Sequence, residues 1–337
     1  MPPGSTAARE LVVGDRELEQ AVAVLHAGGL VAFPTETVYG LGADASNTAA
    51  VRRIFEVKGR PATHPVIVHL ADAVQLASWA REVPEAARRL ARKFWPGPLT
   101  VILRRSPRVS DAVTGGQDTV ALRVPSHPVA LQLLARFGGG VAAPSANRHG
   151  RVSATTAEHV RREFGAAVEC VLDGGEAQVG IESTIVDLSG GTPVLLRPGW
   201  ITAAEVEDAL GVQLAAPAAG APRAPGTLTT HYAPRTPLTL VEGDLLAEFA
   251  TTLMRQGRKV AALALGEARP LLAGVTWLGA PRDAAGYAHA LYASLRRLDD
   301  SGCDTILVER PPRAPEWAAI NDRLARAAAG ASPPEAT

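Results

Sequence analysis

Cysteine is nearly absent from this sequence of 337 residues, which contains only Cys170 and Cys303. The two residues lie far apart and form no CxxC pair, so we expect neither a zinc site nor a dithiol redox motif. Both fall in apolar, strand-like runs. We therefore interpret them as reduced cysteines in the interior of a cytoplasmic protein.

Long apolar runs are also missing. No stretch approaches the roughly 20 apolar residues that cross a lipid bilayer. Residues 1–10 have no apolar segment of the kind found in signal peptides. We therefore expect a cytoplasmic protein that makes no use of a membrane.

An excess of charge is absent as well, because 34 basic and 34 acidic residues cancel. A protein that holds RNA mainly by electrostatics usually carries a basic excess. Aromatic residues, which stack on unpaired bases, make up only 4% of the chain. An RNA-binding module without catalytic activity is thus a disfavoured alternative. The composition does not exclude a local basic cleft.

Two common nucleotide and hydrolase motifs do not occur. The sequence has no GxxxxGK[ST] phosphate-binding loop and no GxSxG nucleophile turn. Residues 40–45 match GxGxxA, but six residues separate them from the preceding apolar run, and the next helix is predicted to begin only near Thr48. A dinucleotide site requires a strand, this loop and a helix in direct succession. We expect no organic prosthetic group.

The order of apolar runs and breakers predicts an α/β protein with two domains. Residues 1–212 are expected to hold a twisted mixed sheet covered by helices. Strands are predicted at 30–33, 66–68, 99–104, 119–124 and 168–172, near Val141, and in a hairpin of 183–188 and 193–197. Helices are predicted at 48–57, 72–82, 84–94, 128–137 and 202–210. Two further helices are predicted from their caps, one from Asp15 to Gly28 and one after Thr155 or Thr156. Residues 35–44 are predicted to form a loop.

The remainder divides into a linker and a smaller domain. Residues 213–237 are rich in Ala, Pro and Gly and have almost no charge, as is typical of a linker. Strands and helices then alternate through residues 238–330, which predicts a small Rossmann-like α/β domain with a largely parallel sheet.

Polar segments at the ends of predicted strands give the clearest indication of chemistry. They offer hydroxyls, backbone N–H groups and cations, which suit a carboxylate or a phosphate. Each segment alone has an ordinary alternative, such as a glycine turn, a helix C-terminus or a surface arginine. Together they predict one pocket for a polyanion, built from residues 34–42, 58–60, 143–153 and 180–184 and from Arg123 and Arg197.

Seven segments in this order resemble the threonylcarbamoyl-AMP synthase family, whose catalytic part is a YrdC-like domain. The resemblance covers residues 15–212. The linker segment APGTLTTHYAP and the second α/β domain resemble the long, two-domain members. The seven segments are FPTETVYGLGADA, KGRPATHPVIVHL, FWPGPLTVIL, ALRVPSHP, APSANRHGRVS, GIESTIVD and LLRPG.

The resemblance implies a role for thirteen residues. Those expected around threonine are Thr37, His69, Arg123, Ser145 and Ser183. Those expected to contact ATP are Arg60, His64, Thr119, Ala143, Ser153, Arg197 and Tyr232, with Lys58 near the phosphates and both Lys58 and Arg60 assisting catalysis. His64 stands where asparagine is common in the family, and Ala143 stands where threonine or serine is common.

The implied reaction joins L-threonine, bicarbonate or CO2, and ATP into threonylcarbamoyl-AMP and pyrophosphate. Mg²⁺ would accompany ATP, and a threonylcarbamoyl-transferase complex would then use the product to modify tRNA next to the anticodon. The linker, with Tyr232, is predicted to fold over the site as a lid. Carbamoyltransferases of hydrogenase maturation also contain a YrdC-like domain, but their cysteine-rich zinc fingers have no counterpart in a chain with two cysteines.

Overall fold

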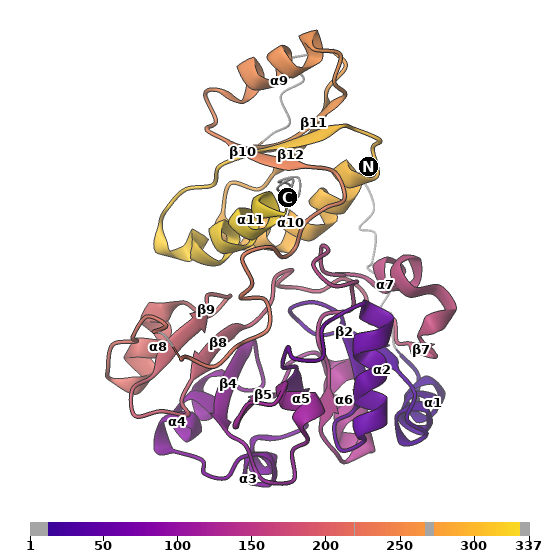
Figure 1. The fold of residues 1–337 in the computed structure, drawn as a ribbon, viewed down its shortest axis with the longest axis vertical. Coiled ribbons are helices and arrows are strands. Elements are labelled where there is room, and N and C mark those ends of the chain that lie inside the picture. The colour runs from indigo at the N-terminus through magenta and orange to yellow at the C-terminus, as the bar shows by residue number, and fades with distance from the viewer. Residues whose placement is uncertain (1–12, 219, 267–272, 331–337) are drawn as a thin grey trace, which may run out of the picture.

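The computed structural model describes residues 13–218, 220–266 and 273–330. They form a larger domain, at the bottom of Figure 1, and a smaller one above it. Among these residues no helix is long and apolar enough to cross a membrane. Residues 1–10, on which the expectation about a signal peptide depends, lie outside the described ranges.

A nine-stranded mixed sheet forms the centre of the larger domain within residues 13–218. Its strand order is β7-β1-β2-β6-β3-β5-β4-β8-β9, with both parallel and antiparallel neighbours, as the sequence predicts. The strands are β1 (Val31–Phe33), β2 (Gly40–Asp44), β3 (Ile67–His69), β4 (Leu99–Arg104), β5 (Thr119–Arg123), β6 (Val141–Ala142), β7 (Cys170–Val171), β8 (Thr184–Asp187) and β9 (Val194–Arg197).

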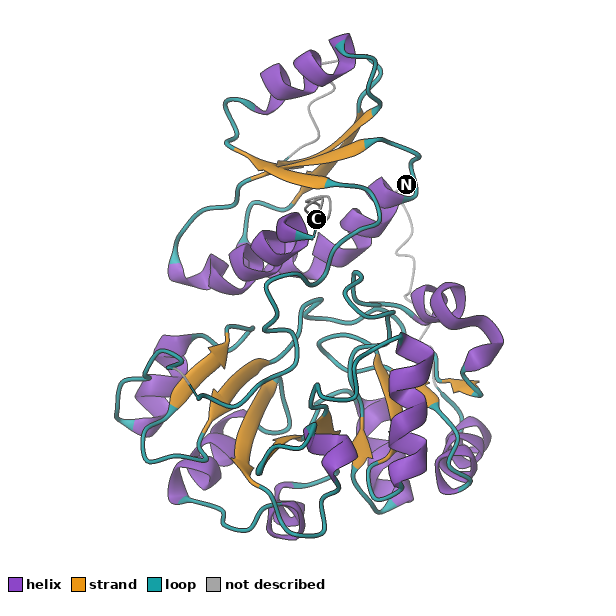
Figure 2. Ribbon diagram, viewed as in Figure 1, coloured by secondary structure: helices purple, strands orange, loops and turns teal. Residues whose placement is uncertain are grey.

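Helices enclose this sheet, and Figure 2 shows them along its outer sides. Asn47 caps α2 by accepting hydrogen bonds from the backbone of Ala49 and Ala50, and Gly59 ends the helix with φ 61°. This cap fixes the place of the Lys58-Gly59-Arg60 segment. The helices are α1 (Asp15–His26), α2 (Thr48–Lys58), α3 (Leu76–Trp79), α4 (Glu85–Phe94), α5 (Asp111–Thr114), α6 (Pro128–Phe137), α7 (Ala157–Phe164) and α8 (Ala203–Leu210).

Three local predictions are wrong. The loop expected at 35–44 contains β2, which pairs antiparallel with β1. Glycines weaken a strand pattern, but Gly42 is needed there because a Cβ would lie 2.8 Å from side-chain atoms of Phe33 and Val141. The helix predicted at 72–82 is a 3₁₀ turn (Ala73–Gln75) followed by the single turn of α3. Asp15 is the first residue of α1, and the N-cap is Gly14.

The smaller domain contains a four-stranded sheet in which every pairing is parallel, in the order β10-β13-β11-β12. Two of its helices, α10 and α11, lie between this sheet and the larger domain, whereas α9 covers the far side (Figure 1). Its elements within the described residues are β10 (Leu238–Val241), α9 (Leu246–Arg255), β11 (Val260–Leu265), β12 (Thr276–Ala280), α10 (Ala284–Asp299), β13 (Thr305–Glu309) and α11 (Ala318–Ala329).

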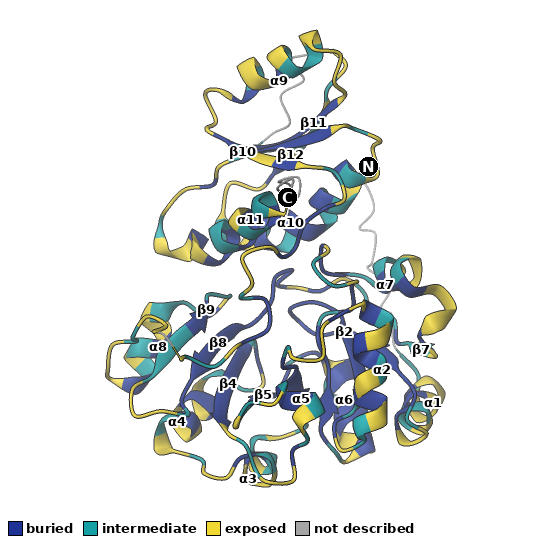
Figure 3. Cartoon of the chain, in the orientation of Figure 1, coloured by how far each residue is buried: buried dark blue, intermediate teal, exposed yellow. Residues whose placement is uncertain are grey.

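The segment between the domains packs on the larger domain at both of its ends. Ala215 forms a β-bridge with Val194, and Ala233 forms one with Arg151. Figure 3 shows that buried residues follow most strands of the larger sheet, whereas exposed residues lie on the outer helices. In the smaller sheet the buried strands are β11 and β13. The described residues of 213–237 include no helix or extended strand, but they are held in place rather than free in solvent.

Replacement of Gly42 by alanine is expected to destabilise the larger domain by about 1–3 kcal/mol, the usual cost of overpacking. The same change at Gly190, where a Cβ would have no neighbour within 4 Å, is expected to change stability by less than about 0.5 kcal/mol. Urea unfolding of both variants measures the difference. Equal midpoints would contradict the close packing at Gly42.

Candidate active site

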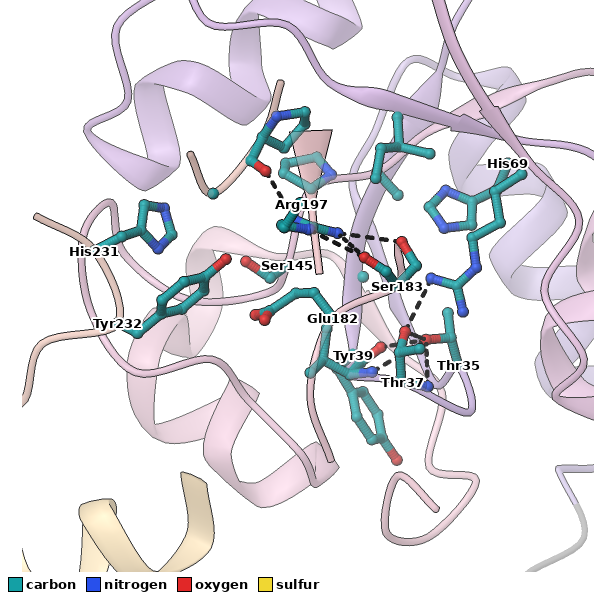
Figure 4. Close-up of a pocket in the computed structure, with 18 of the residues that line it drawn as sticks. Thr35, Thr37, Tyr39, His69, Ser145, Glu182, Ser183, Arg197, His231 and Tyr232 are labelled. Carbon is teal, nitrogen blue, oxygen red and sulfur yellow. Dashed lines mark hydrogen bonds between the residues drawn. The ribbon is translucent and has the colours of Figure 1, made fainter. Parts of the chain in front are cut away.

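A small cavity of about 40 Å³ lies where several strands of the larger sheet end. Its wall is built from the loop after β1, the last residues of β3, β5 and β9, the segment after β6, the segment before β8, and the interdomain segment (Figure 4). Strand ends hold side chains on rigid supports, so they are suitable positions for a binding site.

Nine of the thirteen predicted site residues line this cavity. All five residues expected around threonine are present, together with four of the residues expected to contact ATP. The nine are Thr37, His69, Arg123, Ser145, Ser183, Arg60, Ala143, Arg197 and Tyr232. Sequence segments that are more than 190 residues apart are thus brought into one site.

The other four predicted residues do not line the cavity. Lys58 points into the protein, where its Nζ donates to the backbone oxygens of Ser145, at 2.5 Å, and of Asn147. Burial, with the charge of Arg60 next, lowers the pKa of Lys58 well below its ordinary value. Lys58 therefore fixes the loop that carries Ser145.

His64, Ser153 and Thr119 lie further from the cavity. His64 is the first of three neighbouring imidazoles, with ring centres 5.5 Å and then 6.0 Å apart, that lead through His149 to His231 in the wall. Ser153 reaches the site through a hydrogen bond to a carboxylate in the wall. Thr119 begins β5, at the opposite end of the strand from Arg123.

A buried ion pair forms one end of the cavity. Arg123 donates to Glu36 Oε1 at 2.7 Å, to Thr37 Oγ1 at 2.9 Å and to the backbone oxygen of Gly97 at 3.2 Å. The Arg123 and Glu36 side chains are each only 4% exposed. Glu36 also accepts from the backbone N–H of Ser126 at 3.0 Å. A guanidinium held in this way has a fixed orientation toward a ligand.

His69 lies beside this ion pair and is almost fully buried. Burial, and then the charge of Arg123, lower the pKa of His69 to about 3. The imidazole is therefore neutral at pH 7, and its Nδ1 has no hydrogen-bond partner among the described residues. A neutral ring nitrogen in this position is able to accept a hydrogen bond from a ligand amine or hydroxyl.

Two more guanidinium groups lie at the other side of the cavity. Arg197 donates to the backbone oxygens of Ser183, at 2.9 Å and 3.1 Å, and of Pro225, at 2.8 Å, while Arg60 donates to that of Pro65 at 2.8 Å. Neither forms a salt bridge with a carboxylate within the described part of the chain. Burial lowers the pKa of Arg60 to about 10, so it stays charged at neutral pH. Buried cations without a paired carboxylate favour an anionic ligand.

Two acidic residues of the site were not predicted from the sequence. Glu36 pairs with Arg123, and Glu182 lies in the wall near Arg197. Both belong to polar segments, 34–42 and 180–184, that were recognised at strand ends. The signal that was missed is an acidic residue directly before each of the predicted ligands Thr37 and Ser183.

The interdomain segment closes the cavity through Tyr232. This residue has φ 61°, which makes it the one residue other than glycine with a positive φ in the described chain. Its side chain is 1% exposed, and its Oη lies so close to Gly226 that a Cβ there would be 2.0 Å away. Such a backbone conformation is maintained by packing, as is common at functional sites.

Comparisons with known proteins identify the family of this chain. Residues 23–199 match a family described as "Telomere recombination", and residues 201–329 match one described as "Threonylcarbamoyl-AMP synthase, C-terminal domain". A threonylcarbamoyl-AMP synthase from Pyrococcus abyssi is 42% identical over 318 residues, covering 91% of this chain and 92% of the relative. The chain belongs to the threonylcarbamoyl-AMP synthase family. Its predicted membership, in the long two-domain form, is confirmed.

Other members of the family support the same assignment. The threonylcarbamoyl-AMP synthase of Bacillus subtilis is 41% identical and is covered over 95% of both chains. A putative member from Mycobacterium tuberculosis, 40% identical, matches only 59% of this chain while covering 92% of its own length. The family therefore includes chains that match little more than half of this one.

Solved structures of the family share the whole architecture. A crystal structure of P. abyssi Sua5 with L-threonine superposes with a TM-score of 0.85 at 40% identity, covering 93% of this chain and 94% of that one. A second structure is a variant of the same protein in which a histidine and the adjacent tyrosine are replaced by alanine. It also superposes with a TM-score of 0.85, at 38% identity and with 96% of both chains covered. In the present chain His231-Tyr232 is such a pair.

Replacement of Arg123 by methionine is expected to destabilise the protein by about 3–5 kcal/mol, because it leaves Glu36 as a buried, unpaired charge. Arg92→Met is the matched control. Arg92 also contacts a carboxylate, Glu85, at 2.7 Å, but both side chains are 65% exposed. Its loss should change the free energy of unfolding by about 0–1 kcal/mol. Urea unfolding measures the free energy of unfolding of both variants. A similar loss of stability in the two would contradict the burial of the Arg123–Glu36 pair.

Proposed function

We propose that this chain is an L-threonylcarbamoyladenylate synthase that converts L-threonine, bicarbonate or CO2, and ATP into threonylcarbamoyl-AMP and pyrophosphate. The observation that carries the proposal is the division of one cavity into two ends. One end has a fixed guanidinium beside a neutral histidine. The other has two buried guanidinium groups without a paired carboxylate among the described residues. The first suits an amino acid, and the second suits phosphates.

Threonine fits the end that holds Arg123. A guanidinium carries five N–H donors, and Arg123 uses three of them toward Glu36, Thr37 and Gly97. Two donors remain for the substrate carboxylate. His69 accepts a hydrogen bond from the amine and so orients its nitrogen. The hydroxyls of Thr37 and Ser183 add polar contacts at the same end.

The reaction proceeds in two steps that need no nucleophile from the protein. The amine nitrogen first bonds to the carbon of CO2 and loses a proton, giving a carbamate. With bicarbonate the same bond forms, and the C–OH bond breaks as the hydroxyl leaves with the amine proton as water. A carbamate oxygen then bonds to the α-phosphorus of ATP. The bond from this phosphorus to the bridging oxygen breaks, and pyrophosphate leaves with the electron pair. Arg60 and Arg197 stabilise the charge that develops on pyrophosphate, and the cavity aligns the reactants.

Mg²⁺ enters this scheme as part of the substrate MgATP, where it neutralises phosphate charge. The described residues contain no group of three or more His, Cys, Asp or Glu that could hold an ion. A Mg²⁺ held by phosphates and water suits such a site, because this ion keeps several of its waters.

We further propose that the enzyme acts in the cytoplasm, without an organic prosthetic group, and that a threonylcarbamoyl-transferase complex acting on tRNA takes up the product.

The interdomain segment serves as a lid in this proposal. Cavities that hold drug-sized ligands usually measure about 300–1,000 Å³, whereas the present cavity measures about 40 Å³. Tyr232 fills the space beside Arg60 and Arg197, so it must move before ATP binds. After closure it excludes water from the adenylate, a mixed anhydride that hydrolyses easily. His64, Ala143, Ser153 and Thr119 remain predicted contacts of the nucleotide.

Release of pyrophosphate from ATP is expected only when threonine and bicarbonate are both present. The reason is that the carbamate of threonine is the attacking group. A coupled pyrophosphate assay, run with each substrate omitted in turn, tests this. Equal release with alanine in place of threonine would contradict the substrate, because alanine lacks the hydroxyl that Thr37 and Ser183 would bind.

Tyr232→Ala is expected to release several times more free AMP for each adenylate captured, because water then reaches the intermediate. Leu228→Ala is the matched control, since Leu228 lies in the same segment but is 39% exposed. Chromatography of AMP and threonylcarbamoyl-AMP gives the ratio. An unchanged ratio in the Tyr232 variant would reject the lid and leave the segment a passive spacer.

A further inference from the structure

Glu182 contributes a carboxylate to the cavity wall on the side of Arg197, and this carboxylate is held from both domains. Its Oε1 accepts from Ser153 Oγ of the larger domain at 2.5 Å. Its Oε2 accepts from Tyr292 Oη at 2.8 Å and from Arg323 Nε at 2.9 Å. The last two lie on α10 and α11, more than 100 residues further along the chain. The smaller domain thus supplies two of the three donors to this carboxylate.

The same two residues also hold the lid. The ring of Tyr292 stacks on that of Tyr232, with centres 5.8 Å apart and planes inclined by 24°. The Arg323 guanidinium lies 5.2 Å from the centre of the Tyr232 ring, within the range of a cation–π contact. The Arg323 side chain is fully buried and donates to Asp322 at 2.7 Å as well. Glu182 and the lid therefore share one support.

Charge explains why Glu182 needs this support. Burial alone would raise its pKa, but the charges of Arg323 and Arg197 and the hydrogen bonds from Ser153 and Arg323 lower it to about 2. The group is therefore a carboxylate at neutral pH. Its charge acts on Arg197, but the two groups form no salt bridge, and Arg197 has no paired carboxylate within the described chain. A carboxylate that lost its partners in the smaller domain would compete with phosphates for Arg197.

We infer that Arg323 and Tyr292 are positioning residues of the active site, which hold Glu182 away from Arg197 and fix Tyr232 over the nucleotide. The smaller domain thereby completes the phosphate side of the cavity. The threonine side does not depend on it, because Arg123 is held by Glu36 and Thr37 of the larger domain. This inference rests on the proposed function, since it assigns ATP to the side of Arg60 and Arg197.

The test compares two tyrosines of one helix. Tyr292→Phe removes one hydrogen bond from Glu182 and keeps the ring. Tyr287→Phe is the matched control, because Tyr287 lies on α10, is 1% exposed, and its Oη has no hydrogen-bond partner among the described residues. A hydrogen bond to a charged group is strong enough that its loss should raise the KM for ATP about tenfold or more. The KM for threonine should stay within about twofold, and the control should change neither.

A charge-removal series provides an independent measurement. Arg323→Met should weaken ATP binding more than Tyr292→Phe does, because it frees Glu182 as an anion beside the phosphates. Addition of Glu182→Gln to that variant should restore part of the ATP affinity, since the amide carries no charge to compete for Arg197. If Arg323→Met acted only by destabilising the fold, a second substitution in the site would not restore the affinity for ATP. Calorimetric titration with MgATP measures both variants.

The outcomes separate the inference from the proposed function. Wild-type protein without threonine-dependent pyrophosphate release would overturn the proposed function and this inference with it. Normal wild-type turnover, with the same KM for ATP in the Tyr292→Phe and Tyr287→Phe variants, would overturn the inference alone. An equal rise in the KM for threonine would also overturn it, because that result indicates general loosening of the fold.

Discussion

Burial of positive charge at the ends of strands is the constraint on which the rest of this structure depends. Arg123 and Arg197 end β5 and β9, and Arg60 follows the cap of α2, so all three sit on rigid supports. A buried guanidinium is costly unless its donors find partners. The surrounding loops are accordingly folded to present backbone oxygens or carboxylates to these groups, and in doing so they form the walls of a cavity.

The contact between the domains follows from the same constraint. It combines polar contacts with an apolar cluster in which Val38 and Ile181 of the larger domain pack with Leu291 of α10. Arg296 of α10 donates to the backbone oxygen of Ser153 and forms an ion pair with Glu163, at 3.3 Å in each case. His289 contacts the backbone oxygens of Ala177 and Gln178 at 3.1 Å. Such directional contacts help to fix the orientation of the smaller domain, which matters because its helices carry Tyr292 and Arg323, the residues that hold Glu182 in the cavity wall.

Much of the fold could be predicted from local sequence, because its determinants are local. The continuous apolar runs of β4 and β5 and the glycine that ends α2 mark their own elements. β2 could not be predicted, since its glycines are required by contacts with Phe33 and Val141, which only the folded chain brings near.

The candidate site shows the same division. Residues whose side chains suit anions can be recognised in the sequence, and most of the predicted site residues do line the cavity. The direction in which a side chain points cannot be recognised in this way, because Lys58 points into the protein and not into the cavity. The partners of buried charges are equally hidden, because Glu36 and Arg123 are 87 residues apart, and Glu182 and Arg323 are 141 residues apart.

The nearly filled cavity has a consequence for how tightly nucleotide is held. If the closed lid is the resting form, ATP binds only the fraction of molecules in which Tyr232 has withdrawn. The apparent dissociation constant is then the intrinsic one divided by that fraction, so an open population of about one in a hundred weakens the affinity about a hundredfold. Tyr292 and Arg323 have a second role, because they also hold Glu182 away from Arg197. Residues that only stabilise the closed form tune nucleotide affinity, and selection acting on them can adjust the enzyme to the ATP concentration of its cell without altering any residue that touches the phosphates.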